Sequence, residues 1–256
     1  QQQRLLVVNS WFCPQKPWLL YLSQSRDAGD TTTVWVPNAV ISLYENGNYL
    51  GKFVHESKGR YRSPVLAQNG KTYRIEVEAE GFDPVSALDS MPAKVHIDSA
   101  FYDYSTEVAS LSFTDPVNET NYYEVGPPFT TSPDPVVLAE GYTTINPYGN
   151  FFSDKLINGQ SYTYTARQDE HFLYMPPYEY YRPCERQPCF FHLRALSQSL
   201  YLFHKSWIQH GFNITAGSIY DIPYLSEPLN VYNNVQGGLG IFAAYQEDSL
   251  QIVLRR

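Results

Sequence analysis

The sequence predicts a mainly β protein made of two β-sandwich-like domains, the second with one packed α-helix. The chain has 256 residues, more than the roughly 100 to 200 of a typical single domain. It contains 22 Tyr and 14 Phe, together with 18 Pro and 15 Gly. Aromatic residues favour strands, and Pro and Gly favour turns, so this composition indicates many short strands rather than a helical bundle.

The first domain is expected to span residues 1–98. Its predicted strands are residues 4–12, 18–23, 39–44, 49–55, 59–64 and 72–78. Asn46–Gly47 is a dipeptide typical of a tight hairpin turn between two of these strands, and Asn69–Gly70 repeats the signal. The apolar pattern resets around Met91–Ala93, which places the domain boundary near Asp98.

Residues Thr72–Glu78 alternate between apolar and polar side chains, as expected for a strand with one buried face. Tyr73, Ile75 and Val77 are predicted to point inward, and Arg74, Glu76 and Glu78 to point toward water. We therefore interpret Glu76 and Glu78 as part of a solvated strand face, because an acid–base pair needs a cleft as well as proximity.

The second domain is expected to span residues 99–256. Its predicted strands lie within residues 95–111, 121–125, 151–156, 162–166, 228–232, 240–245 and 250–254. Asn158–Gly159 is expected to close another hairpin. The glycines of Gly237-Gly238-Leu239-Gly240 lack the context of a phosphate-binding loop and are interpreted as positions of positive φ or of tight backbone packing.

One helix is predicted, over Ser197–His210, packed on the sheet of the second domain. Ser197 is a suitable N-cap, and Gly211 is a typical C-terminal stop. Leu200, Phe203 and Trp207 share one stripe of this helix.

Charge and hydropathy exclude some classes of partner. The formal net charge is −8 and the sequence pI is about 5.2, so no nucleic-acid partner is expected. No apolar run approaches the roughly 20 residues that a membrane-spanning helix needs. The residues at the start of the sequence do not form a signal peptide.

Two of the three cysteines lie close together in the sequence. Cys184 and Cys189 enclose a short segment that contains Pro188, and a disulfide between them is predicted, which would indicate an oxidising compartment. A zinc site would need two more ligands. Cys13 is expected to be a buried thiol.

Sequence motifs nominate no catalytic residue, metal site or cofactor. The six histidines show no recognised metal-ligand spacing, and no Gly-x-Ser-x-Gly motif is present. Asp169 and His171 would share one face of a strand, but two ligands are too few for a metal site, and surface hydrogen bonding is favoured.

The segment most suited to recognition is rich in Tyr and Pro. It places Tyr174, Tyr178, Tyr180, Tyr181 and Arg182 beside the predicted disulfide, as candidate ligand- or partner-binding residues. Rigid aromatic side chains bind at low entropic cost. The alternative interpretation is that these tyrosines cover the core of the second domain.

Two family resemblances are carried by particular motifs. The first is carried by residues 39–43, Gly59-x-Tyr61, Gly70-x-x-Tyr73-x-Ile75-x-Val77 and Gly81-Phe82. This part of the chain resembles the prealbumin-like or carboxypeptidase-regulatory-like sandwich.

The second resemblance covers the whole chain. It is carried by residues 6–11, Met91-Pro92, Asp115-Pro116, Asn121-Tyr122-Tyr123 and the closing motif from Pro228 to Phe242. On these motifs the chain resembles the Bacteroidetes lipoprotein family catalogued as domain of unknown function 4249. The resemblance implies a lipid-anchored protein of the outer membrane and cell surface, partnered by a TonB-dependent transporter, with a signal peptide and lipidated Cys upstream of Gln1. Cys13 is not expected to be that anchor.

Three functional hypotheses follow, in order of preference. The first is a non-catalytic accessory lipoprotein that aids nutrient capture or uptake by the transporter. The second is a structural or assembly component of an outer-membrane complex that has no small ligand of its own. The third is a glycan or peptide hydrolase, which would require paired carboxylates or a nucleophile within reach of a base.

Overall fold

Strands dominate the part of the chain that the structure describes. The computed structural model describes residues 3–14, 16–27, 29–30, 32–117, 119–126, 150–167, 184, 188–219 and 229–255, with helix side chains described as far as residue 210. Within these residues the protein is mainly β, with one α-helix and one short 3-10 helix. This confirms the predicted fold class.

The chain divides into two compact units, each made of two separate stretches of sequence. Unit 1 comprises Gln1–Pro92 and Ser197–Tyr245, and unit 2 comprises Ala93–Leu196 and Gln246–Arg256. The division at Asp98 expected from the sequence differs from this in one main respect, because residues 197–245 return to unit 1. The return has a physical basis, since the first strand of unit 1 pairs with a strand from this late stretch.

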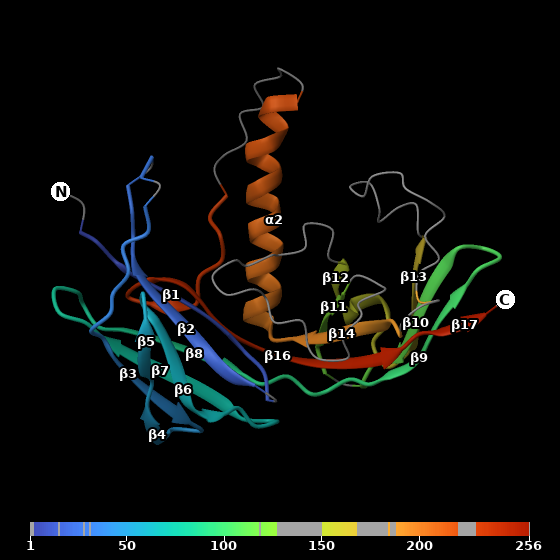
Figure 1. Ribbon diagram of the computed structural model, residues 1–256, viewed down its shortest axis with the longest axis horizontal. Coiled ribbons are helices and arrows are strands. Elements are labelled where there is room, and N and C mark those ends of the chain that lie inside the picture. Colours follow the sequence, from blue (N-terminus) through green and yellow to red (C-terminus); the bar gives the residue numbers. More distant parts are fainter. Residues whose placement is uncertain are drawn as a thin grey trace. The chain divides into compact units, whose positions relative to one another are not determined.

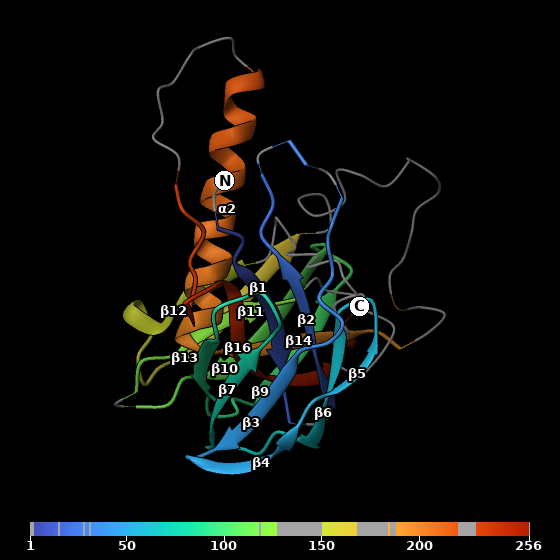
Figure 2. The same ribbon diagram turned by 90° about the vertical axis from the view of Figure 1, so that its left-hand side faces the viewer.

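Unit 1 is built from two sheets. Its strands are β1 (Leu6–Phe12), β2 (Pro17–Gln24), β3 (Val40–Glu45), β4 (Asn48–Lys52), β5 (Val54–Ser57), β6 (Arg60–Leu66), β7 (Thr72–Glu78), β8 (Val85–Ser90), β15 (Val235–Gln236) and the first part of β16 (Leu239–Gln251). One sheet has the order β15-β8-β7-β3-β4, and within unit 1 the other has the order β16-β1-β2-β6-β5. The strands β3, β4 and β7 are seen side by side near the bottom of Figure 2.

The core of unit 1 lies between these two sheets and is rich in aromatic side chains. The rings of Phe12 and Trp18 are 4.2 Å apart, and those of Phe12 and Phe242 are 4.8 Å apart. Tyr73 from the five-stranded sheet meets Trp18 edge to face at 5.0 Å. Burying large rings in such geometries contributes more than their buried area alone. Residues from both ends of the chain therefore complete one core.

Gly240 marks a point in β16 where the neighbouring strand leaves no room for a side chain. Its φ is +112°, and a Cβ placed on it would lie 1.9 Å from the carbonyl oxygen of Val8 in the neighbouring β1. Gly237 also has a positive φ, of +78°. The interpretation of these glycines as positions of positive φ and tight backbone packing is confirmed.

Unit 2 is likewise built from two sheets around its own core. Its elements are β9 (Ile97–Asp103), β10 (Val108–Thr114), β11 (Tyr122–Val125), β12 (Asn150–Ser153), η1 (Asp154–Leu156), β13 (Ser161–Arg167), β14 (Phe190–Leu196), the last part of β16, and β17 (Val253–Arg255). One sheet has the order β13-β10-β9-β17, and within unit 2 the other has the order β12-β11-β14-β16. Tyr123, Phe191, Leu193 and Phe113 are among the fully buried residues of this core.

The α-helix, α2 (Gln198–Ile219), is longer than the sequence predicts. It is the long orange helix of Figure 1. The side-chain Oγ of Ser197 accepts the backbone N–H of Leu200 at 3.2 Å, which confirms the predicted N-cap. The predicted stop at Gly211 is wrong, because the helix continues to Ile219. An interior Gly costs about 1 kcal/mol relative to Ala but does not by itself end a helix.

The helix belongs to unit 1 and contacts its strands, whereas the sequence places it on the sheet of the second domain. The ring of Phe203 lies 6.2 Å from that of Trp11 in β1, and the Ser199 hydroxyl donates to Asp89 in β8 at 3.1 Å. Leu200 and Phe203 are buried, whereas Trp207 on the same predicted stripe is 44% exposed. The apolar stripe is therefore covered only near the start of the helix.

The three Asn–Gly dipeptides form different kinds of connection between strands. Asn46 and Gly47 both have positive φ, of 48° and 85°, and join β3 to β4 in a hairpin, as predicted. Asn69–Gly70 instead joins β6 to β7, which belong to different sheets.

The hairpin predicted at Asn158–Gly159 is wrong. On one side of this turn β12 pairs with β11, and on the other side β13 pairs with β10 in the second sheet of unit 2. Gly159 has a φ of +69°, and its N–H donates to Asp115 Oδ2 at 2.8 Å. A positive φ permits a tight turn, but it does not determine which strand each flank joins.

Candidate functional site

Four ionisable side chains of unit 2 are buried together, and we call them the buried quartet. They are Glu124 from β11, His192 and Arg194 from β14, and Glu247 from β16. All four residues are at most 9% exposed. Charged residues are almost never buried to this degree unless they are paired, so this cluster is the first candidate for a functional role.

Strand alternation places the quartet on one face of its sheet. His192 and Arg194 are two residues apart in β14 and so share a face, and Glu124 lies directly opposite Arg194 in the pairing of β11 with β14. Their chain neighbours Tyr123 and Leu193 point the other way, into the hydrophobic core of unit 2. The quartet therefore lies on the face of the sheet that is turned away from that core.

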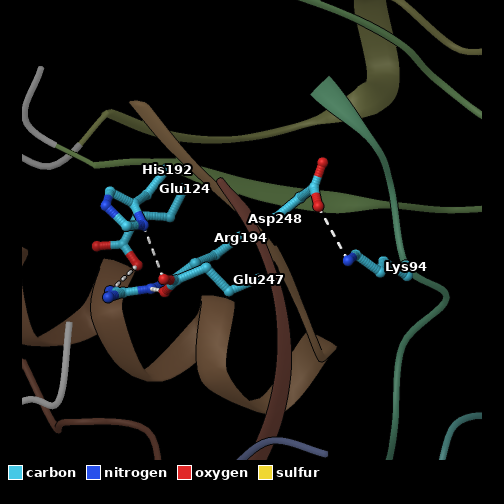
Figure 3. A network of polar contacts seen from close by, with 6 residues as sticks. All are labelled: Lys94, Glu124, His192, Arg194, Glu247 and Asp248. Atoms are coloured by element: carbon cyan, nitrogen blue, oxygen red, sulfur yellow. Dashed lines mark hydrogen bonds and ion pairs between the residues drawn. The ribbon is translucent and has the colours of Figure 1, made fainter. Parts of the chain in front are cut away.

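Arg194 is the centre of the quartet, as Figure 3 shows. Its Nε donates to Glu247 Oε2 at 2.5 Å, and its Nη1 donates to Glu124 Oε2 at 3.1 Å. The other carboxylate oxygen of Glu247, Oε1, lies 2.9 Å from His192 Nδ1. Three neighbouring strands are thus linked through one guanidinium group and two carboxylates.

The pairing within the quartet determines the charge state of Glu247. Burial by itself raises the pKa of this carboxyl group, because the interior disfavours the charged form. The hydrogen bond with His192 and the positive charge of Arg194 act in the opposite direction and prevail, so the pKa of Glu247 lies below its ordinary value. The group is held as a carboxylate.

The chemistry open to the quartet follows from these contacts. A general acid or base must exchange a proton with a reacting group. Both oxygens of Glu247 are instead engaged by side chains of the same cluster, and the residue is buried from solvent. The arrangement suits the joining of β11, β14 and β16 better than it suits proton transfer.

A second ion pair lies next to the quartet in sequence and is also drawn in Figure 3. Lys94 Nζ contacts Asp248 Oδ1 at 2.9 Å, and the backbone N–H of Ile97 donates to Asp248 Oδ2 at 2.9 Å. Burial raises the pKa of Asp248, but these two partners outweigh it and lower the pKa overall. The contact ties the start of β9 to β16.

The candidate binding residues Tyr174, Tyr178, Tyr180, Tyr181 and Arg182 lie outside the described residues, as do Asp169 and His171. Their role in ligand or partner binding stays a prediction.

The cysteines are described at all three positions. A disulfide joins Cys184 to Cys189, with the two Cα atoms 5.3 Å apart. Cys189 is buried in the core of unit 2, and Cys184 packs against that core. Cys13 is buried in unit 1, outside this disulfide.

Two further findings concern the described residues as a whole. No group of three or more His, Cys, Asp or Glu side chains among them is placed to hold a metal ion. The one α-helix of this part of the chain does not have the length and apolar character required to cross a membrane.

The buried quartet was not predicted from the sequence. Its only sequence signal is that Glu124, His192 and Arg194 interrupt apolar residues at alternate positions in two strands. The same pattern is typical of a strand with one face in water, so alternation alone would assign these residues to the surface.

The model of a family described as Domain of unknown function (DUF4249) matches residues 1–251. A search of curated proteins found no match.

Proposed function

This chain belongs to the DUF4249 family, and on that basis we propose that it is a non-catalytic accessory lipoprotein of the outer membrane. In this proposal it is anchored by a lipid at the cell surface, associates with a TonB-dependent transporter, and aids the capture or uptake of a nutrient.

The family match carries the proposal, because it extends over nearly the whole chain and includes the closing motif from Pro228 to Phe242. The internal pairing of the buried quartet supports the non-catalytic part. Arg194 and Glu247 are engaged with each other, and Arg194 also contacts Glu124 while Glu247 also contacts His192. These charges join strands of one unit.

Affinity purification from the native membrane tests the association. The full-length lipidated protein, with a C-terminal tag, is extracted in mild detergent, and the proteins that co-purify are quantified by mass spectrometry. The control is an unrelated lipoprotein of the same membrane, tagged and extracted in the same way. We expect a TonB-dependent barrel in stoichiometric amount with the first protein and not with the second. A transporter that purifies without this protein, and that works unchanged after its deletion, contradicts the proposal.

The same experiment separates nutrient capture from a purely structural role. Tyr178, Tyr180 and Tyr181 are replaced together by Ala, and both co-purification and cargo uptake are measured. Loss of uptake with the partner retained supports ligand capture by these residues. Loss of the partner, together with a purified chain that binds no ligand, supports an assembly component instead.

A further inference from the structure

An aligned row of large side chains crosses the outer face of the five-stranded sheet of unit 1. We call it the Tyr–Arg row, and it consists of Leu88 in β8, Arg74 in β7, Tyr44 in β3 and Tyr49 in β4. Arg74 is paired in register with Leu88 on one side and with Tyr44 on the other, and Tyr44 is paired with Tyr49. The row spans three inter-strand spacings, or about 14 Å.

The row lies on the surface. Tyr49 and Leu88 are each 54% exposed, and the Arg74 side chain is 35% exposed. The neighbouring residues in the same strands, among them Leu43 and Ile75, are fully buried in the core of unit 1. Single exposed apolar residues are ordinary on a protein surface, but an aromatic pair and an arginine in register on adjacent strands form a continuous contact surface.

Contacts within the row hold its polar groups in fixed positions. The Arg74 guanidinium lies over the ring of Tyr44, 4.1 Å from its centroid, and the rings of Tyr44 and Tyr49 meet edge to face at 5.7 Å. The Tyr44 hydroxyl donates to Glu76 Oε2 at 2.8 Å, and Arg74 donates to Glu76 Oε1. The row therefore needs little reorganisation to bind a ligand.

Hydrogen-bonding capacity is left over after these contacts. A guanidinium has five N–H donors and a carboxylate has about four lone-pair sites. Arg74 and Glu76 thus offer donors and acceptors side by side, beside an aromatic surface. Hydrogen bonds from Tyr44 and then Arg74 lower the pKa of Glu76, which keeps it an acceptor near neutral pH.

The charges of Arg74 and Glu76 favour no ionised ligand. The positive charge of Arg74 is compensated by its contact with Glu76, so the pair presents no net charge to a ligand. An extended, uncharged molecule with adjacent hydroxyl groups meets all of these features. Its C–H groups can pack on the electron-rich face of a tyrosine ring, and its hydroxyls can both donate to Glu76 and accept from Arg74.

We propose that the Tyr–Arg row of unit 1 binds a neutral carbohydrate chain, with Tyr49 as the stacking platform and Arg74 and Glu76 as the hydroxyl-binding groups. The residues of this site differ from the candidate binding tyrosines at positions 174–181. It is also independent of the proposed transporter association, because binding is measured on the purified chain alone.

Native affinity electrophoresis tests the proposal. The purified chain is run in gels that contain amylopectin, galactomannan, xyloglucan or arabinoxylan as neutral polysaccharides, and polygalacturonate as an acidic one. We expect retardation by at least one neutral polysaccharide. Tyr49→Ala is expected to weaken that binding about tenfold, because it removes the stacking ring, and Tyr49→Phe, which keeps the ring, is expected to stay within about threefold of the parent protein.

Val54→Ala is the matched control, since Val54 is 62% exposed on β5 of the other sheet of unit 1. It is expected to bind like the parent protein, and circular dichroism establishes that each variant is folded. Three results would overturn the proposal. They are no retardation by any neutral polysaccharide, retardation by polygalacturonate alone, and equal retardation of the parent protein and Tyr49→Ala. None of them bears on co-purification with a transporter.

Discussion

Removal of one charge from the buried quartet leaves another charge in the interior without its partner. Arg194 is contacted by both Glu124 and Glu247, and Glu247 is shared with His192. A buried ion pair contributes little in comparison with a well-packed apolar pair, but its disruption from one side is expensive. The quartet therefore makes unit 2 sensitive to single substitutions that change no volume.

We expect Glu247→Gln to destabilise unit 2 by about 3 to 5 kcal/mol, because the buried charge of Arg194 then loses the carboxylate of Glu247. The unfolding free energy is measured by urea denaturation, with probes in unit 2. Asp27→Asn is the matched control. Asp27 pairs with Arg4 at 2.8 Å in an exposed position, so its substitution should change stability by no more than about 0.5 kcal/mol. A change below about 1 kcal/mol for Glu247→Gln would show that the quartet does not hold the strands together.

The quartet also predicts how stability depends on pH. The pKa of Glu247 is lower in the folded chain than its ordinary value of 4.5, so the unfolded chain binds the proton more tightly. The stabilisation from this group is fully present above pH 4.5 and is lost as the pH falls through the lowered pKa. The stability difference between the parent protein and Glu247→Gln should therefore shrink on acidification. Urea midpoints of both proteins, measured from neutral pH to below 4.5, provide the comparison.

Single residues also show where sequence patterns succeed and where they do not. Alternation correctly assigned Tyr73 to the core and Arg74 to the outer face of β7. The same rule would place His192 and Arg194 in water, yet both are buried. Alternation separates the two faces of a strand but carries no information about what covers each face.

Among the elements, α2 depends on how its first turn is capped. Ser197 Oγ accepts the N–H of Leu200, and Ser199 beside it donates to the buried Asp89. Burial raises the pKa of Asp89, although hydrogen bonds from Ser197 and from the backbone of Ala244 lower it in part. The start of the helix is thus fixed to β8 by polar contacts.

We expect Ser197→Ala to cost about 1 kcal/mol, because one N–H of the first turn loses its acceptor. Amide hydrogen exchange should then be faster in the first turn of α2, with helical ellipticity nearly unchanged. Ser57→Ala on the exposed strand β5 is the control and should leave both measurements unchanged. Unaltered exchange in Ser197→Ala would mean that the packing of Phe203 on Trp11 alone fixes this end of the helix.

Turn signals were reliable for local backbone geometry and less so for strand pairing. Gly47, Gly70 and Gly159 all have positive φ, as their Asn–Gly dipeptides suggest. Only the first joins two strands that pair with each other. The partner of a strand is chosen by side-chain packing over long sequence distances, which a dipeptide cannot encode.

For the molecule as a whole, unit 1 is incomplete without residues far along the chain. Val235, Phe242 and Ala244 belong to the same buried core as Phe12 and Trp18. The boundary expected from the reset in the apolar pattern divides the chain once, whereas unit 1 also includes the later stretch of residues 197–245.

We expect residues 1–98 alone to lack a stable fold, because their core would lack the side chains that β16 contributes. Residues 1–92 joined to residues 197–245 through a flexible Gly/Ser linker should instead unfold cooperatively. Thermal denaturation followed by circular dichroism compares the two proteins. A cooperative transition for residues 1–98 would contradict the division of the chain described above.

The parallel pairing of β1 with β16 has a consequence for how the protein is made. Val7 is aligned with Leu239, so unit 1 is completed by contacts between residues that are very far apart in the sequence. Such contacts raise the contact order of the fold. During synthesis the early strands emerge long before β16, and their apolar faces stay exposed until β16 is available. Folding should accordingly be slow and late, completed only after the residues of β16 have been synthesised, and a holding chaperone should raise the yield of native protein more than that of a chain whose domains follow one another in sequence.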